Sequence, residues 1–176
     1  MNLETPSADV VERARKGEGS AREALASRYY PAVFSFARKL TGRAETALDV
    51  TQETFLRAFS RIEQHDPSYS FASWLFKIAA NYIRDLRRRT ERPEPREAES
   101  SDLRAESILE RSEDLDRVRR ALDSLPADLR LPLVLHLQEE LPVREIAFVL
   151  DQTDNAVRMK IYRGLQKIRA LVREES

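Results

Sequence analysis

The most informative pattern of hydrophobic and polar positions lies at residues 71–89, "FASWLFKIAANYIRDLRRR". Apolar side chains recur there at spacings of four, three and four, as on the buried face of an amphipathic helix. They are Phe71, Leu75, Ile78 and Tyr82. A second stripe on another face is polar and basic. It consists of Lys77, Asn81, Arg84 and Arg88. Burial in a helical bundle needs only the first stripe, so the second stripe indicates a surface that contacts something else.

Similar patterns predict three more helices in the first ninety residues. A short helix ends at Gly17, and Ser20 with Glu23 matches a capping box that opens a long helix ending before Gly42. The segment 44–62 follows, and Ser70 is the expected N-cap of the helix that begins at residue 71. The third helix has a predicted buried face of Leu48, Phe55, Ala58, Phe59 and Ile62. We expect a four-helix bundle.

The last sixty residues predict a second helical unit. A helical stripe that includes Leu122 and Leu125 stops at Pro126, and Pro132 must either kink the next helix or mark its first turn. A short helix, a turn of about four residues and a longer helix complete the layout of a helix-turn-helix.

The detail of these last two helices supports that interpretation. Ile146, Ala147 and Leu150 can pack inward, and Thr153 can cap the longer helix. Its predicted buried stripe is Val157, Ile161, Leu165 and Ile168, which leaves Asn155, Met159, Tyr162, Arg163 and Gln166 outside, with Arg158 and Lys160 on the flanks. Arg and Asn can contact base edges in a DNA major groove, while Lys neutralises phosphates. A basic helix face that only meets solvent is the alternative.

Composition and charge define the fold class. The 176 residues contain only 4 Gly, 7% aromatic residues and no Cys, which argues against a β-rich fold and against a disulfide framework. Residues 94–117 hold 4 basic and 9 acidic side chains although the whole chain has no net charge. We therefore predict an all-α protein of two small helical domains, 7–90 and 115–174, joined by a flexible acidic linker at 91–114. A solvated helix from about residue 103 is the alternative for part of that linker.

The sequence does not favour an enzyme or a metalloprotein. His65 and His136 lie far apart, and the carboxylates near His136 lack convergent partners for metal or acid-base chemistry. There is no glycine-rich phosphate loop, so we expect no cofactor. No apolar run is long enough to span a bilayer and no signal peptide is evident, so we expect a cytoplasmic protein without membrane insertion.

A family resemblance covers nearly the whole chain apart from the connector. It is carried by "DVTQETFLRAF", a "DP" loop, "FASWLFKIAANYIRDLRRR", "LDSLPADLRLPLVLHLQEELPVREIAFVL" and "AVRMKIYRGLQKIR". In this order they resemble the two domains of a bacterial extracytoplasmic-function sigma factor. The first unit is similar to sigma region 2 and the last unit to region 4.

The resemblance implies three surfaces. The polymerase-binding surface of this chain, which would contact the largest subunit of core RNA polymerase, would use Asp49, Gln52 and Glu53. The minus-ten promoter surface would use Ser68, Tyr69, Lys77, Asn81, Arg84 and Arg88, with an extruded base held at the loop and Trp74 in the core. The minus-thirty-five surface would use Asn155, Arg158, Met159, Lys160, Tyr162 and Arg163. For any of these residues, a solvated helix face is the simpler alternative.

The implied function is promoter-directed initiation of transcription. The chain would bind core polymerase, select promoters, help melt the minus-ten region, and be restrained by an anti-sigma factor. The chain departs from the family pattern at the turn, where Asp151, Gln152 and Thr153 replace the usual Gly-containing sequence, but Asp adopts left-handed conformations. A free-standing helix-turn-helix regulator that binds duplex DNA alone is one alternative. A pure interaction module without DNA dependence is the other.

Overall fold

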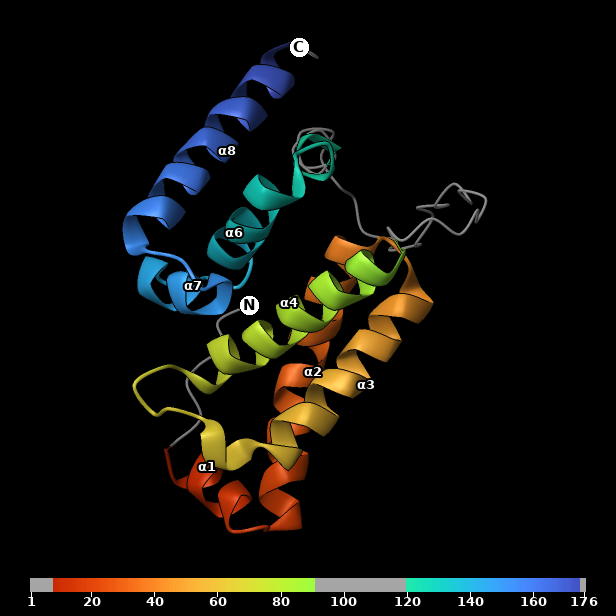
Figure 1. Ribbon diagram of the computed structural model, residues 1–176, viewed down its shortest axis with the longest axis vertical. Coiled ribbons are helices and arrows are strands. Elements are labelled where there is room, and N and C mark those ends of the chain that lie inside the picture. The colour runs from red at the N-terminus through yellow and green to blue at the C-terminus, as the bar shows by residue number, and fades with distance from the viewer. Residues whose placement is uncertain (1–7, 91–119, 175–176) are drawn as a thin grey trace, which may run out of the picture.

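A computed structural model describes residues 8–90 and 120–174 of the protein (Figure 1). All secondary structure in these ranges is helical, which confirms the all-α prediction. The predicted linker at 91–114 lies outside the described residues. The first half contains α1 (Ala8–Arg15), α2 (Gly19–Thr41), α3 (Ala44–Ser60), the 3-10 turn η1 (Ile62–Gln64) and α4 (Phe71–Thr90); the second half contains α6 (Ala127–Leu137), α7 (Val143–Leu150) and α8 (Asp154–Glu174).

The core of the first half forms where α2, α3 and α4 meet. Aromatic rings on α2 and α4 interlock, with 5.6 Å between the ring centroids of Tyr29 and Phe71 and 5.0 Å between those of Phe36 and Phe76. Trp74 is 7% exposed and belongs to this core, as predicted. Packing of this kind fixes the rotation of α4 about its axis and thereby the direction of its basic face.

Two sequence predictions about the first half are wrong. The capping box at Ser20 does not form, because α2 already begins at Gly19 and the Ser20 hydroxyl donates to the Glu18 carboxylate instead, at 2.7 Å. Leu48 was expected in the core but is 40% exposed. The buried face of α3 is instead rotated toward Ala47, Val50 and Thr51.

The second half is built around α6 and α8. Leu133, Val134 and Leu135 of α6 are fully buried. A β-carbon added at Gly164 of α8 would lie 2.4 Å from Leu133 Cδ1, so the close approach of the two helices requires a glycine. Pro132 lies inside α6 rather than in its first turn, so the first-turn alternative is wrong.

The helix-turn-helix prediction is confirmed in its local detail. Asp151 ends α7 in the left-handed conformation, with φ 52° and ψ 47°. The Thr153 hydroxyl oxygen then accepts the Ala156 N–H at 3.2 Å and caps α8. Ile146, Ala147 and Leu150 are buried as expected.

The two halves pack against each other. In Figure 1, α4 lies between α2 and α3 on one side and the unit formed by α6, α7 and α8 on the other. The contacts join α4 to α7 and α2 to α6. Among the helices of residues 8–90 and 120–174, none is long and apolar enough to cross a membrane.

Candidate nucleic-acid interface

The loop before α4 is shaped by its own side chains. The Asp66 carboxylate accepts the Ser68 N–H at 2.8 Å, which lowers the pKa of Asp66, and its carbonyl accepts the Tyr69 N–H at 3.1 Å. The Ser70 hydroxyl oxygen accepts the Ser73 N–H at 3.1 Å, which confirms Ser70 as the N-cap of α4. Ser68 is exposed at the tip, and Tyr69 is half-buried.

His65 and Arg15 hold this loop in place, and sequence reasoning missed this role of both residues. The His65 ring is buried against Phe71 and Trp74, and its Nε2 lies 3.1 Å from the Tyr69 carbonyl. Burial lowers the pKa of His65. Because a carbonyl oxygen can only accept, Nε2 is the donor in this contact. Arg15 of α1 donates to the carbonyls of Ile62 and His65. No local pattern could reveal Arg15, because its partners lie some fifty residues away.

The predicted minus-ten residues of α4 share one face of the helix. Arg84 and Arg88 are exposed, while Lys77 and Asn81 are half-buried. Arg84 Nη1 donates to Asn81 Oδ1 at 2.9 Å, so the amide and the guanidinium form one polar group. This side of α4 therefore carries the cations and the amide that the sequence predicted.

The sequence had suggested that this whole face of α4 is open to solvent. In the structure, α7 covers the start of the face. Lys77 Nζ is 2.6 Å from Asp151 Oδ1 and 4.2 Å from the centre of the Phe148 ring. The rings of Tyr69 and Phe148 stack at 3.8 Å with 13° between their planes. The Glu145 carboxylate accepts hydrogen bonds from the N–H and the hydroxyl of Ser70, at 3.1 and 3.0 Å. Helical periodicity within α4 carries no information about this distant partner.

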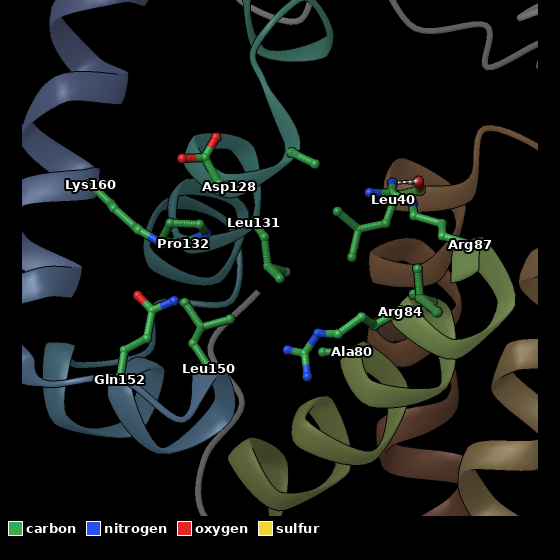
Figure 2. Close-up of a pocket in the computed structure, with 12 residues that line it drawn as sticks. Leu40, Ala80, Arg84, Arg87, Asp128, Leu131, Pro132, Leu150, Gln152 and Lys160 are labelled. Carbon is green, nitrogen blue, oxygen red and sulfur yellow. Dashed lines mark hydrogen bonds between the residues drawn. The ribbon is translucent and has the colours of Figure 1, made fainter. Parts of the chain in front are cut away.

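A cavity of about 230 Å³ lies between the two halves, further along α4 (Figure 2). Arg84 and Arg87 line one wall, and Leu131 and Pro132 of α6 line the other. Figure 2 also shows Lys160 of α8 extending toward this space. Lys160, which sequence reasoning placed on the flank of the outer face of α8 and among the minus-thirty-five residues, is half-buried here and so lies apart from that face.

The outer face of α8 is solvent-exposed. Met159 and Tyr162 are 43% and 59% exposed, large values for such side chains. The other exposed members of the predicted minus-thirty-five set are Asn155, Arg158 and Arg163. The structure thus brings five of the six predicted residues together on one accessible surface.

The outer face of α3 carries the predicted polymerase-binding residues. Asp49 and Gln52 are exposed, while Glu53 is half-buried and forms an ion pair with Arg57 at 2.6 Å. Leu48 and Leu56 lie on the same helix and are 40% and 68% exposed. Sequence reasoning missed both leucines as surface residues; their spacing of four from Gln52 was the available signal.

Residues 8–90 and 120–174 contain no group of three or more His, Cys, Asp or Glu side chains placed to hold a metal ion. The site described here is a set of basic, amide and aromatic groups on helices, which is suited to binding a polyanion.

Comparison with known families identifies these units. The family model for Sigma-70 region 2 matches residues 25–93, and the model for Sigma-70, region 4 matches residues 115–168. The two matches together cover well over half of the chain. The chain belongs to the extracytoplasmic-function sigma factors. The resemblance inferred from the sequence is thereby confirmed.

Individual relatives agree with this placement. The chain is 34% identical over 151 residues to the ECF RNA polymerase sigma factor SigE of Mycolicibacterium smegmatis, covering 82% of this chain but only 58% of that protein. It is 29% identical over 173 residues to the ECF RNA polymerase sigma-E factor of Salmonella typhimurium, covering 90% of each.

Solved structures resemble the whole arrangement. CnrH in complex with the cytosolic domain of CnrY matches with a TM-score of 0.72 and 28% identity, over 96% of this chain and 97% of that one. RpoE of Bartonella quintana, in complex with the anti-sigma factor NepR, matches with a TM-score of 0.67 and 19% identity, over 86% of this chain and 96% of that one, and supports the fold alone.

Proposed function

We propose that this chain binds core RNA polymerase, directs it to specific promoters and helps to melt the minus-ten region. The observation that carries the proposal is the presence of region 2 and region 4 units, in that order, in one chain. A free-standing helix-turn-helix regulator has no need of a region 2 unit, so the comparisons favour a sigma factor. The chain would act in the cytoplasm, as a binding factor without catalysis of its own.

The minus-ten contacts are assigned to the loop and basic face of α4. Lys77, Arg84 and Arg88 would bind phosphates, and Asn81 would contact a base edge. Ser68 and Tyr69 would hold an extruded base, with ring stacking worth about 1 to 3 kcal/mol. The support for this assignment is the shared face of these side chains and the rigid loop that ends at the Ser70 cap.

The minus-thirty-five contacts are assigned to the exposed face of α8. Arg163 and Asn155 are suited to hydrogen bonding with base edges in the major groove, and Arg158 is suited to phosphates. Met159 and Tyr162 offer apolar contact to the thymine methyl group. Lys160 would contribute only after the two halves separate, because it lines the cavity between them.

The contact with polymerase is assigned to α3. Asp49 and Gln52 would supply polar contacts, with Glu53 at the edge because Arg57 already engages it. Leu48 and Leu56 would add apolar area at the centre of the patch, since exposed leucines on a helix indicate a protein interface when they cluster. We also propose an anti-sigma partner, because the similar RpoE of Bartonella quintana was solved in complex with the anti-sigma factor NepR, and the similar CnrH in complex with the cytosolic domain of CnrY.

Transcription from a promoter library tests the proposal. Core polymerase with the chain should yield transcripts that core polymerase alone does not. Binding of the chain alone to duplex promoter DNA, with no effect of polymerase, would support the regulator instead.

Pull-down with core polymerase tests the assignment of α3. Leu56→Ala, and the pair Asp49→Ala with Gln52→Ala, should weaken capture of the chain. Glu23→Ala, which is exposed on α2, should leave capture unchanged.

A further inference from the structure

Three side chains at the α7 end of the interface engage three groups of the proposed minus-ten surface at the same time. The Glu145 carboxylate accepts the Ser70 N–H and hydroxyl, at 3.0 to 3.2 Å. The Phe148 ring stacks on Tyr69 at 3.8 Å. The Asp151 carboxylate pairs with Lys77 at 2.6 Å. The α7 side thus presents an anion, a ring and a second anion in sequence, and the guanidinium of Arg144 lies beside them, 5.4 Å from the centre of the Tyr69 ring.

These groups have the chemistry of a short piece of single-stranded nucleic acid. A carboxylate at a helix N-terminus or beside a Lys occupies the place that a phosphate takes, because both are anions that accept charge-assisted hydrogen bonds. A phenyl ring on a tyrosine occupies the place of a stacked base. The N-terminus of α4 at Ser70 therefore already binds an anion, the Glu145 carboxylate, from another part of the chain.

The spacing of the two helices makes the match possible. Ser70 and Lys77 are separated by about 10.5 Å along α4, and Glu145 and Asp151 by about 9 Å along α7, at 1.5 Å per residue. Ser70 pairs with Glu145 and Lys77 pairs with Asp151, so the two segments run in the same direction. All three contacts can then form without bending either helix.

The interface is also suited to being reversible. The side chains of Lys77 and Asp151 are 25% and 58% exposed, and exposed ion pairs are weak and are screened by salt. A permanent interface between domains is mostly apolar, whereas this end of the α4–α7 contact consists of charges and one ring pair.

We propose that α7 is an internal stand-in for the minus-ten strand: it occupies the single-strand site of the region 2 unit, in which Ser70 is a phosphate-binding residue. This inference rests on the proposed function. It adds Ser70 as a DNA-binding residue and α7 as a competitor of the DNA within the same chain. Single-stranded DNA and α7 cannot use Ser70, Tyr69 and Lys77 together. The free chain therefore holds its minus-ten site closed until the two halves separate.

The test uses the full chain with Glu145→Gln and Asp151→Asn combined. Both changes keep the shape and remove the charge, and Asn tolerates the left-handed conformation at position 151. The probe is fluorescein-labelled single-stranded DNA of randomised sequence. Its affinity should rise about fivefold to thirtyfold, the range that corresponds to removing weak surface contacts. The control, Glu23→Gln with Glu63→Gln, changes net charge equally at two exposed acids away from the interface and should have a much smaller effect.

Closure is measured in the same proteins. The chain has no cysteine, so Ser27→Cys on α2 and Ala170→Cys on α8, both exposed, can be labelled for energy transfer. Transfer should fall in the double variant and on addition of the DNA probe to wild type. Ser70→Asp keeps a good N-cap residue but places a carboxylate where the Glu145 carboxylate binds, so it should lower both energy transfer and DNA affinity while helix content stays the same.

The outcomes separate this inference from the proposed function. Unchanged energy transfer in the double variant, or a fall in transfer without a gain in DNA affinity, would overturn the role of α7. Tight DNA binding by Ser70→Asp would overturn the role of Ser70. If neither the free chain nor its complex with core polymerase binds the probe in any variant, the proposed function itself fails.

Discussion

The helices α4 and α8 carry similar basic faces but present them differently. The face of α8 is open to solvent, whereas the first two turns of α4 are covered by α7. The difference lies at the helix starts. Both helices are capped by a hydroxyl of their own sequence, Thr153 for α8 and Ser70 for α4, but only the cap residue of α4 also bonds to another helix, through Glu145. Basic residues alone therefore do not determine which face is closed.

The largest effect is expected from Gly164→Val, which should destabilise the half of the molecule that carries the open face of α8 and leave the half that carries α4 folded. The new side chain would collide with Leu133, and overpacking of this kind costs about 1 to 3 kcal/mol of unfolding free energy. Trp74, the only tryptophan, reports on the first half alone, so the transition followed by circular dichroism should begin at lower denaturant than the transition followed by fluorescence. Gly19→Ala, which meets no atom within 4 Å, is the control. Equal shifts of both transitions would mean that the halves unfold as one unit.

Arg163→Ala is expected to affect the open face next most strongly. Loss of a bidentate base contact costs about 1 to 3 kcal/mol at one position of the minus-thirty-five element. Lys167→Ala should weaken binding less, and equally on all promoters. Polymerase bound to each variant can be scored on a series of altered minus-thirty-five elements. Full discrimination at every position by Arg163→Ala would remove Arg163 from base contacts.

Arg84→Ala and Arg88→Ala should have a smaller effect, on the part of α4 that α7 leaves exposed. Each substitution removes one proposed phosphate contact, so the slope of log affinity against log salt should fall by about one for each. The slope is measured for promoter binding by the polymerase complex. An unchanged slope would show that this part of α4 only meets solvent.

The smallest effect is expected on the pH dependence of the stability of the first half, through His65 in the loop before α4. Burial lowers the pKa of His65, so the unfolded chain binds a proton more readily than the folded one. Stability of the first half should therefore decrease as pH falls below the unfolded value of about 6.5, and continue to decrease down to the folded pKa. His65→Phe should flatten this part of the profile when Trp74 fluorescence is followed during denaturation. An equally steep profile in that variant would assign the dependence to other groups.

Most local features of the fold were predictable from the sequence, with the capping box at Ser20 as an exception, and long-range features were not. The caps at Ser70 and Thr153 and the left-handed Asp151 depend on neighbouring backbone atoms, so residue type and order were enough. Leu48 was misplaced because a helix can satisfy the same periodicity with its stripe rotated by one residue, and only packing against α2 and α4 decides the choice.

The candidate site shows the same limit. Most side chains of α4 and α8 were assigned to the correct faces, since helical geometry determines which of them point away from a stripe, although Ile78, Tyr82 and Leu165 of the predicted buried stripes are only half-buried. Arg15, His65 and the α7 contacts were missed, because each joins a loop or helix to a segment that the linear pattern does not relate to it. The inward position of Lys160 has the same origin, because the cavity exists only where both halves meet.

The separation of 75 residues between Ser70 and Glu145 also has a consequence in time. Ribosomes add about 5 to 20 residues per second and domains fold in order from the N-terminus, so α7 is synthesised about 4 to 15 s after the start of α4. During that interval the first half can fold while Tyr69, Ser70 and Lys77 are uncovered. Each newly made molecule therefore passes through a period of seconds in which its proposed single-strand site is accessible, before the rest of the chain is available to cover it.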